Sequence, residues 1–154
     1  MAHDPKEIRD AYDRYVAQRD KAEAGEVGWQ TLADFFTEDA TFVDPAWGRV
    51  EGRDAIRHFM VESMTGLEGW EFPREWTGVD GDRLVSVWQN RLPGRREDGS
   101  YYQAPGVSVM TYAGDGRFSS EEDILNMAHV FELIRESGWK PGPGAVAPPP
   151  TPRR

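Results

Sequence analysis

The chain has 154 residues and a formal net charge of −9, from 18 basic and 27 acidic side chains. This length fits one domain with or without a tail. The acidity argues against nucleic acid or an anionic membrane surface as a partner, because both attract basic patches. The chain has no cysteine, which excludes disulfides and thiolate chemistry, and its three histidines lie too far apart to suggest a metal site. Six Trp, seven Phe and five Tyr predict an aromatic core or a pocket lined with rings.

The sequence contains no sign of a targeting or membrane-spanning segment. The first residues lack the basic and apolar regions of a signal peptide. No apolar run approaches the roughly 18–20 residues that a membrane helix needs. We therefore expect a cytoplasmic protein.

The first half of the chain is mainly helical. Asp4-Pro5-Lys6-Glu7 is a helix start, with an Asp N-cap and Pro in the first turn. An apolar stripe that includes Tyr12 and Tyr15 continues this helix. The pattern then predicts a short helix, a strand that proline ends, a loop and a third helix, at 29–36, 40–45, 47–52 and 53–64.

The second half is mainly β. Trp70, Phe72 and Trp76 alternate with polar residues, as in a half-buried strand. Three more strands and a last helix follow, at 83–92, 101–112, 117–126 and 127–137. We expect Val130, Phe131 and Ile134 to be the buried side chains of the last helix. Helices followed by an antiparallel meander predict an α+β fold with the helices against one face of a curved sheet.

The end of the chain differs in composition from the rest. Residues 141–154 are rich in Pro and Gly, which predicts a flexible tail after a domain at 1–140.

One stretch of the chain resembles a known superfamily. Glu38-Asp39-Ala40-Thr41-Phe42-Val43-Asp44-Pro45, followed by Gly52-Arg53-Asp54-Ala55-Ile56-Arg57-His58-Phe59, is similar to the strand, loop and helix of nuclear transport factor 2-like proteins. This group includes the SnoaL-like polyketide cyclases and ketosteroid isomerases, and the similarity covers about residues 5–138. The resemblance implies a cystatin-like α+β roll: a cone-shaped, curved antiparallel sheet that wraps around helices and encloses a hydrophobic pocket. The fold supports several activities, so the resemblance says less about function.

The resemblance also implies catalytic residues. The Asp of the Asp-Pro pair is the general base of ketosteroid isomerases, and here it is Asp44. A tyrosine of the first helix supplies an oxyanion donor there, and Tyr15 matches it. The second donor in those isomerases is a protonated aspartic acid, but the matching position here is Ser108, which departs from the pattern. Asp44 also has a simpler interpretation, since Asp-Pro often starts a turn.

Strand periodicity suggests further ligand-binding residues. Trp88 and Asn90 share one face of their strand, and an amide among aromatic rings is typical of a ligand site. Tyr102 shares a face of the next strand with Ser108. Tyr12, on the same helix face as Tyr15, and Trp47, in the loop after Asp44, complete this group of candidates. The alternatives are core packing for Tyr12 and Tyr15, and an edge or interface amide for Asn90.

The last strand carries an acidic cluster, and the strand before it has an apolar outer side. Glu121, Asp123 and Asn126 are candidates because SnoaL-like enzymes place an acid or base on this strand; the alternative is a solvated strand end. Asp44 with Glu121 or Asp123 could then divide the acid and base roles. Val107 and Val109 predict a partner surface, and the resemblance implies a homodimer through the outer sheet face.

Two functions remain open from the sequence. The first is a cofactor-free SnoaL-like enzyme that binds a small polyketide-, steroid- or terpenoid-like molecule and catalyses proton transfer, isomerisation, cyclisation or hydration. The second is a non-catalytic ligand-binding or dimerisation module of the same fold.

Overall fold

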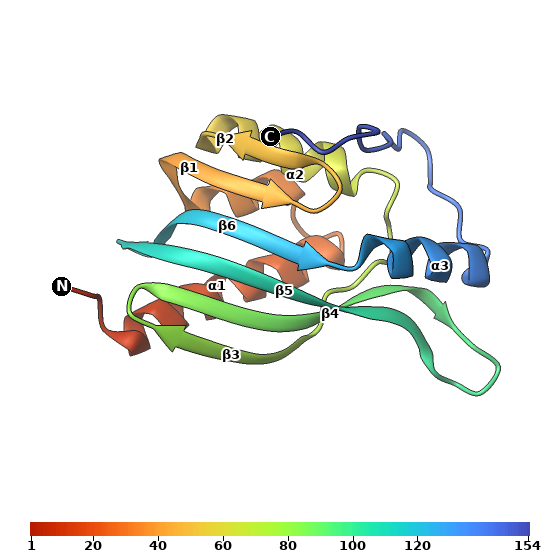
Figure 1. The fold of residues 1–154 in the computed structure, drawn as a ribbon, viewed down its shortest axis with the longest axis horizontal. Helices are drawn as coiled ribbons and strands as arrows, with labels where there is room; N and C mark the ends of the chain where they lie inside the picture. The colour runs from red at the N-terminus through yellow and green to blue at the C-terminus, as the bar shows by residue number, and fades with distance from the viewer.

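A single curved, unclosed sheet of six strands organises the molecule in the computed structural model, which describes residues 1–154 (Figure 1). The strand order is β2-β1-β6-β5-β4-β3. The strands are β1 (Phe36–Asp44), β2 (Gly48–Glu51), β3 (Arg74–Asp80), β4 (Arg83–Arg95), β5 (Tyr101–Gly114) and β6 (Arg117–Leu125). All neighbours pair antiparallel except β1 and β6, which run parallel. The predicted α+β fold with a curved sheet and a β3–β6 meander is confirmed.

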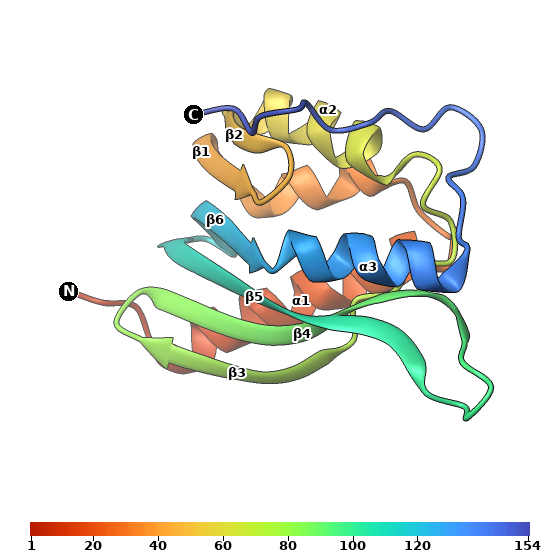
Figure 2. The ribbon, with the colours of Figure 1, turned by 45° about the vertical axis from the view of Figure 1, so that its right-hand side comes forward.

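The helices cover the concave side and the open end of the sheet (Figures 1 and 2). They are α1 (Pro5–Glu23), the 3-10 helix η1 (Trp29–Phe35), α2 (Arg53–Met64) and α3 (Met127–Ser137). Asp4 caps α1 by accepting a hydrogen bond from the Lys6 amide at 2.7 Å. Gly138 ends α3 in the left-handed region, with a φ of 71° that a residue with a Cβ adopts at a cost. None of the helices is both long and apolar enough to cross a membrane.

Three details of the sequence prediction are wrong. The predicted loop at 47–52 contains β2, whose four residues pair with β1. The predicted strand around Trp70 begins only at Arg74, because the segment before it packs its rings inward and pairs at a single residue. In α3, Leu133 is buried whereas Phe131 is 46% exposed, because Phe131 lies at the rim of a cavity rather than against the sheet.

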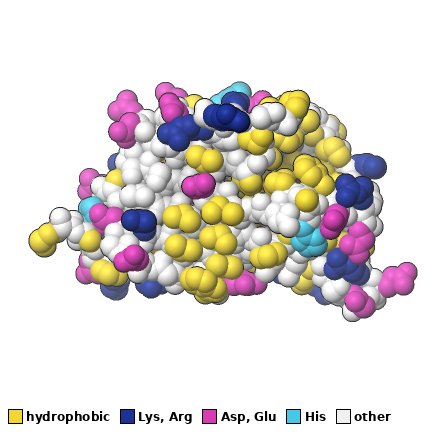
Figure 3. All heavy atoms as spheres, viewed as in Figure 1, with side chains coloured by type: hydrophobic (Ala, Val, Ile, Leu, Met, Phe, Trp, Pro, Cys, Tyr) yellow, Lys and Arg dark blue, Asp and Glu magenta, His cyan; other side chains and the backbone are white.

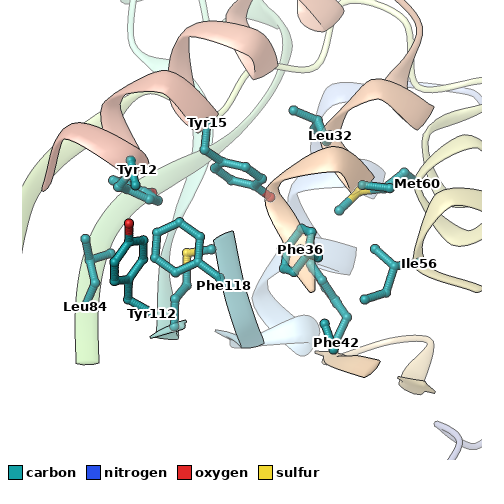
Figure 4. Close-up of a cluster of buried hydrophobic side chains, with 14 of the residues drawn as sticks. Tyr12, Tyr15, Leu32, Phe36, Phe42, Ile56, Met60, Leu84, Tyr112 and Phe118 are labelled. Atoms are coloured by element: carbon teal, nitrogen blue, oxygen red, sulfur yellow. The ribbon is translucent and has the colours of Figure 1, made fainter. Parts of the chain in front are cut away.

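The hydrophobic core lies between α1, η1, α2 and the inner face of the sheet. Figure 4 shows Tyr12 and Tyr15 projecting from α1 into this core, with Phe36, Phe118 and Tyr112 facing them from the strands. A smaller cluster joins α3 to β4 and β5 around Trp70 and Leu133. The two clusters leave room between them, and this space forms the cavity described below.

The segment after α3 does not leave the domain. It runs back along α2 and ends beside β2 (Figures 1 and 2). The Gly142 amide donates to the Gly66 carbonyl at 2.9 Å, and the Arg153 carbonyl accepts from the Arg49 amide at 2.8 Å. A domain boundary at residue 140 and a flexible tail stay predictions.

Candidate functional site

A cavity of about 490 Å³ opens between α2, α3 and the inner face of the sheet. Figure 3 shows hydrophobic side chains gathered around this hollow. Twenty of its 30 lining residues are hydrophobic, and its volume lies in the range of small-molecule sites. The cavity wall is therefore mainly apolar, and its few polar side chains are the candidates for chemistry.

A bulge in β6 turns two carboxyl groups into this cavity. Phe118 pairs with Tyr112 and Ser120 with Thr111, so Ser119 is an extra residue in β6. The extra residue reverses the alternation of faces, and Glu121 and Asp123 consequently point inward after Phe118. The sequence left the inward-facing acid undetermined, because a bulge of this kind has no marker in the amino-acid order.

Ser108 connects these acids to the sheet. Its hydroxyl donates to Asp123 Oδ1 at 2.6 Å and accepts from the indole N–H of Trp88 at 2.9 Å. The indole can lie across the sheet because its cross-strand partner is Gly106, where a Cβ would come within 2.6 Å of the Trp88 ring. Trp88 and Ser108 therefore fix the position of the Asp123 carboxyl group.

Tyr15 holds the second acid. Its hydroxyl donates to Glu121 Oε2 at 3.1 Å, and both side chains are buried. Burial raises the pKa of Glu121, although the hydrogen bonds from Asp123 and Tyr15 oppose the rise. Burial and the neighbouring Glu121 raise the pKa of Asp123 well above its ordinary value. Burial and mutual proximity therefore favour the protonated form of this pair, and the upward shift in pKa is larger at Asp123.

Asp44 makes the turn that the sequence allowed, and it also lines the cavity. Its Oδ1 accepts from the amides of Ala46 and Trp47, each at 2.8 Å, which makes the turn after β1. The same carboxyl group lines the cavity, and its Oδ2 makes no hydrogen bond within the chain. Burial raises the pKa of Asp44, while the two amide donors favour the ionised form and oppose the rise. Asp44 and Asp123 thus face one cavity from the ends of adjacent strands, in different electrostatic environments.

The structure brings most of the predicted site residues to this cavity. Those that line it are Asp44, Tyr15, Trp47, Trp88, Asn90, Ser108, Glu121 and Asp123. Three candidates lie elsewhere. Tyr12 is 1% exposed in the core, Tyr102 packs beside the Arg96 guanidinium, and Asn126 caps α3 by accepting from the His129 amide.

Arg19 is a cavity residue that the sequence interpretation missed. It is buried, its guanidinium donates to the Phe72 carbonyl at 2.9 Å, and its Nε lies 3.8 Å from the Glu23 carboxylate. It follows Tyr15 by four residues, which places both side chains on one face of α1. A charged residue on an apolar helix stripe was the signal that could have identified it. No group of three or more His, Asp or Glu side chains is placed to hold a metal ion.

A family model described as a SnoaL-like domain matches residues 8–121, which span most of the cavity-forming elements. The chain belongs to the SnoaL-like domain family. No curated protein matches this SnoaL-like chain.

Solved structures share its fold. A protein from Jannaschia sp. CCS1, described as a SnoaL-like polyketide cyclase, is 19% identical and has a TM-score of 0.65, with 87% of this chain and 96% of that chain covered. TerC, co-crystallised with polyporic acid, is 22% identical with a TM-score of 0.64, covering 84% and 98%. SalBIII, an epoxide hydrolase/cyclase-like enzyme in pyran ring formation of the polyether salinomycin, is 19% identical with a TM-score of 0.63, covering 82% and 95%. At these identities the likeness shows the fold.

The contact between Tyr15 and Glu121 gives a direct test of the site. Tyr15→Phe should lower the free energy of unfolding by about 1–3 kcal/mol, because it removes the hydrogen bond that Tyr15 donates to a buried acid. Tyr12→Phe is the matched control, since the Tyr12 hydroxyl is buried without a hydrogen-bond partner and its loss should change little. Urea unfolding measures both variants. Equal effects of the two substitutions would contradict the assigned hydrogen bond.

Proposed function

We propose that this SnoaL-like protein is a cofactor-independent enzyme that binds a small hydrophobic molecule and acts on it by general acid–base catalysis. The ligand would be polyketide-, steroid- or terpenoid-like, and the reaction a proton transfer, isomerisation, cyclisation or hydration. One observation carries the proposal: Asp44 and Asp123 face a single apolar cavity, where Asp44 accepts two main-chain hydrogen bonds while burial beside Glu121 raises the pKa of Asp123 well above its ordinary value.

Asp44 is the base in this proposal. Its turn engages Oδ1 and leaves Oδ2 without a hydrogen-bond partner in the chain, and two main-chain donors stabilise its charge. It removes a proton next to a carbonyl group or activates a water molecule.

Asp123 is the acid. Burial and the neighbouring Glu121 raise its pKa and so favour the protonated form, and Ser108 holds the carboxyl group in place. Asp123 protonates the substrate oxygen on which negative charge develops. Glu121, which accepts a hydrogen bond from Tyr15, helps to keep Asp123 protonated by raising its pKa. In this proposal Ser108 acts by orienting Asp123, an acid on the neighbouring strand. Ketosteroid isomerases instead have an aspartic acid at the position that matches Ser108.

The descriptions of two structural neighbours bear on the class of ligand that we propose. TerC was crystallised with polyporic acid, and SalBIII is named for a ring-forming step in a polyether. The pyran ring of a polyether is a cyclic, oxygen-containing structure, and molecules of this kind are the class of ligand that we propose for the present cavity.

A non-catalytic ligand-binding module is the second candidate. The hydrogen bonds of Asp44 to its own turn favour it, because they give this carboxylate a structural role without any reaction. Two probes separate the candidates. N-phenylnaphthylamine, whose fluorescence rises in apolar sites, reports binding, and nitrobenzisoxazole, whose ring opens to a coloured phenolate when a base removes its C–H proton, reports general-base activity.

The enzyme should bind the first probe and accelerate ring opening of the second above the rate in buffer. Binding without acceleration would favour the module. The absence of both would contradict an accessible ligand cavity.

We also propose that two copies pair through the outer face of the sheet. Hydrophobic side chains gather over β3, β4 and β5 in Figure 3, and outward-facing Val107 and Val109 are only partly covered. Sedimentation should give the mass of two chains, and Val109→Asp should give the mass of one. Gln30→Asp, an exposed site on η1, is the control and should remain a dimer.

A further inference from the structure

The segment after α3 contributes part of the cavity wall. Its side chains continue the apolar lining that α2 and α3 begin, and they lie over the side of the cavity that the sheet leaves open. The residues of this segment that line the cavity are Pro141, Ala145, Val146, Ala147 and Pro148.

Two glycines, Gly66 and Gly48, allow the segment to pack closely against the surface of the domain. Gly66 faces Gly142 and Ala145, and a Cβ on Gly66 would meet the Ala145 side chain within van der Waals radii. Gly48 faces the backbone of Arg153 in the same way. Main-chain hydrogen bonds form at both points, from Gly142 to Gly66 and between Arg153 and the two residues on either side of Gly48, Trp47 and Arg49. The surface of the domain therefore matches this segment at both ends of its path.

The contact at the end of the segment, between Arg153 and the residues around Gly48, lies next to the turn that Asp44 makes. The Arg153 guanidinium is 6.0 Å from the centre of the Trp47 ring, and Trp47 donates its amide to Asp44. The positive charge of Arg153 opposes the rise in pKa that burial causes at Asp44. The end of the segment thus lies next to the proposed base.

The segment has few other attachments. It forms neither helix nor regular strand, and Ala145, Val146 and Ala147 expose one side to solvent while the other faces the cavity. Detaching it at two points would open the cavity without disturbing the core, because no residue after 140 belongs to either hydrophobic cluster.

We propose that residues 141–154 are the closing wall of the ligand cavity and limit the size of the molecule that it retains. This inference rests on the binding half of the proposed function, and it is independent of the acid–base half. A ligand enters when the segment lifts, and the apolar side chains at 145–148 then cover it.

Ala147→Trp in the full chain tests the wall directly. An indole in place of the methyl group would occupy cavity space, so the affinity for N-phenylnaphthylamine should fall by about tenfold, the change that corresponds to 1.4 kcal/mol. Thr151→Trp is the matched control: it adds the same side chain four residues later, at an exposed position outside the cavity lining, and should bind as the parent does.

Gly142→Pro tests the closing contact. It removes the N–H that donates to Gly66 and leaves every lining side chain in place. The dissociation rate of the bound probe, measured by rapid dilution, should rise, while the urea midpoint of the domain should stay unchanged. An unchanged dissociation rate would overturn the closing role.

The outcomes distinguish this inference from the proposed function. If Ala147→Trp binds the probe as tightly as the parent, the segment is not a wall and only this inference fails. If it weakens binding while Asp44→Asn leaves proton transfer unchanged, the wall stands and the catalytic proposal fails. If the parent does not bind the probe, both fail.

Discussion

Asp44→Asn should reduce ring opening of nitrobenzisoxazole by about 10²–10⁴-fold, the range that a positioned general base contributes. The asparagine side chain has the same shape, and its Oδ1 can still accept from the amides of Ala46 and Trp47. The turn should therefore persist, and the loss would report the missing negative charge on the cavity side. Stopped-flow or steady-state absorbance of the phenolate product gives the rate.

Asp39→Asn is the control for this substitution. Asp39 belongs to the same strand, but it is exposed and outside the cavity, so the rate should not change. The parent rate should fall as pH decreases through the pKa of Asp44, because the base must be ionised, and burial places this fall above the ordinary aspartate range. A rate that is insensitive both to pH and to Asp44→Asn would exclude Asp44 as the base.

Asp123→Asn should stabilise the protein at pH 8 and much less at pH 5. An unfolded aspartate titrates near pH ~3.9, whereas burial and Glu121 raise the pKa of Asp123 well above this in the folded chain. Between the two values the folded state binds the proton and the unfolded state does not. The free energy of unfolding therefore falls as pH rises through this window, by about 1.4 kcal/mol for each unit of pKa elevation.

Asparagine cannot ionise, so the variant should escape this loss while keeping an acceptor for Ser108. Urea unfolding at the two pH values measures the difference between variant and parent. Asp98→Asn should have the opposite effect and lower the free energy of unfolding at pH 8. The hydrogen bonds from Ser100 lower the pKa of Asp98, so the contribution of its carboxylate to stability is present at pH 8 and is lost as pH falls toward the acid range. The same stability difference at both pH values for Asp123→Asn would contradict a buried, protonated acid.

The helices show how much of the fold local sequence determines. Residues 53–64 and 127–137 were predicted as helices and form α2 and α3, because apolar spacing and caps are local signals. The order of helices before a meander also indicated the curved α+β sheet. Short segments such as β2 were missed, since a strand of four residues is defined by its partner more than by its own pattern.

The candidate site could be predicted from the sequence only in part, and the tertiary structure decided the rest. The resemblance to SnoaL-like proteins indicated Asp44, Tyr15 and Ser108, strand periodicity indicated Trp88, and all four line the cavity. Tyr12 follows the same helical periodicity as Tyr15, but it packs against the core because a position three residues earlier on α1 lies beyond the end of the cavity.

By itself, the sequence determined the fold class, the SnoaL-like resemblance and chemistry limited to carboxyl, hydroxyl and amide groups. The tertiary structure decided which acids face inward, because an extra residue at Ser119 reverses the alternation of β6 and period-two counting from Phe118 would have chosen the wrong face. It also decided that the segment 141–154 passes over the cavity, which its residues 141–148 help to line, and ends beside β2. Their Pro/Gly-rich composition describes the chain alone, whereas their position depends on contacts with Gly48 and Gly66, which are distant in sequence.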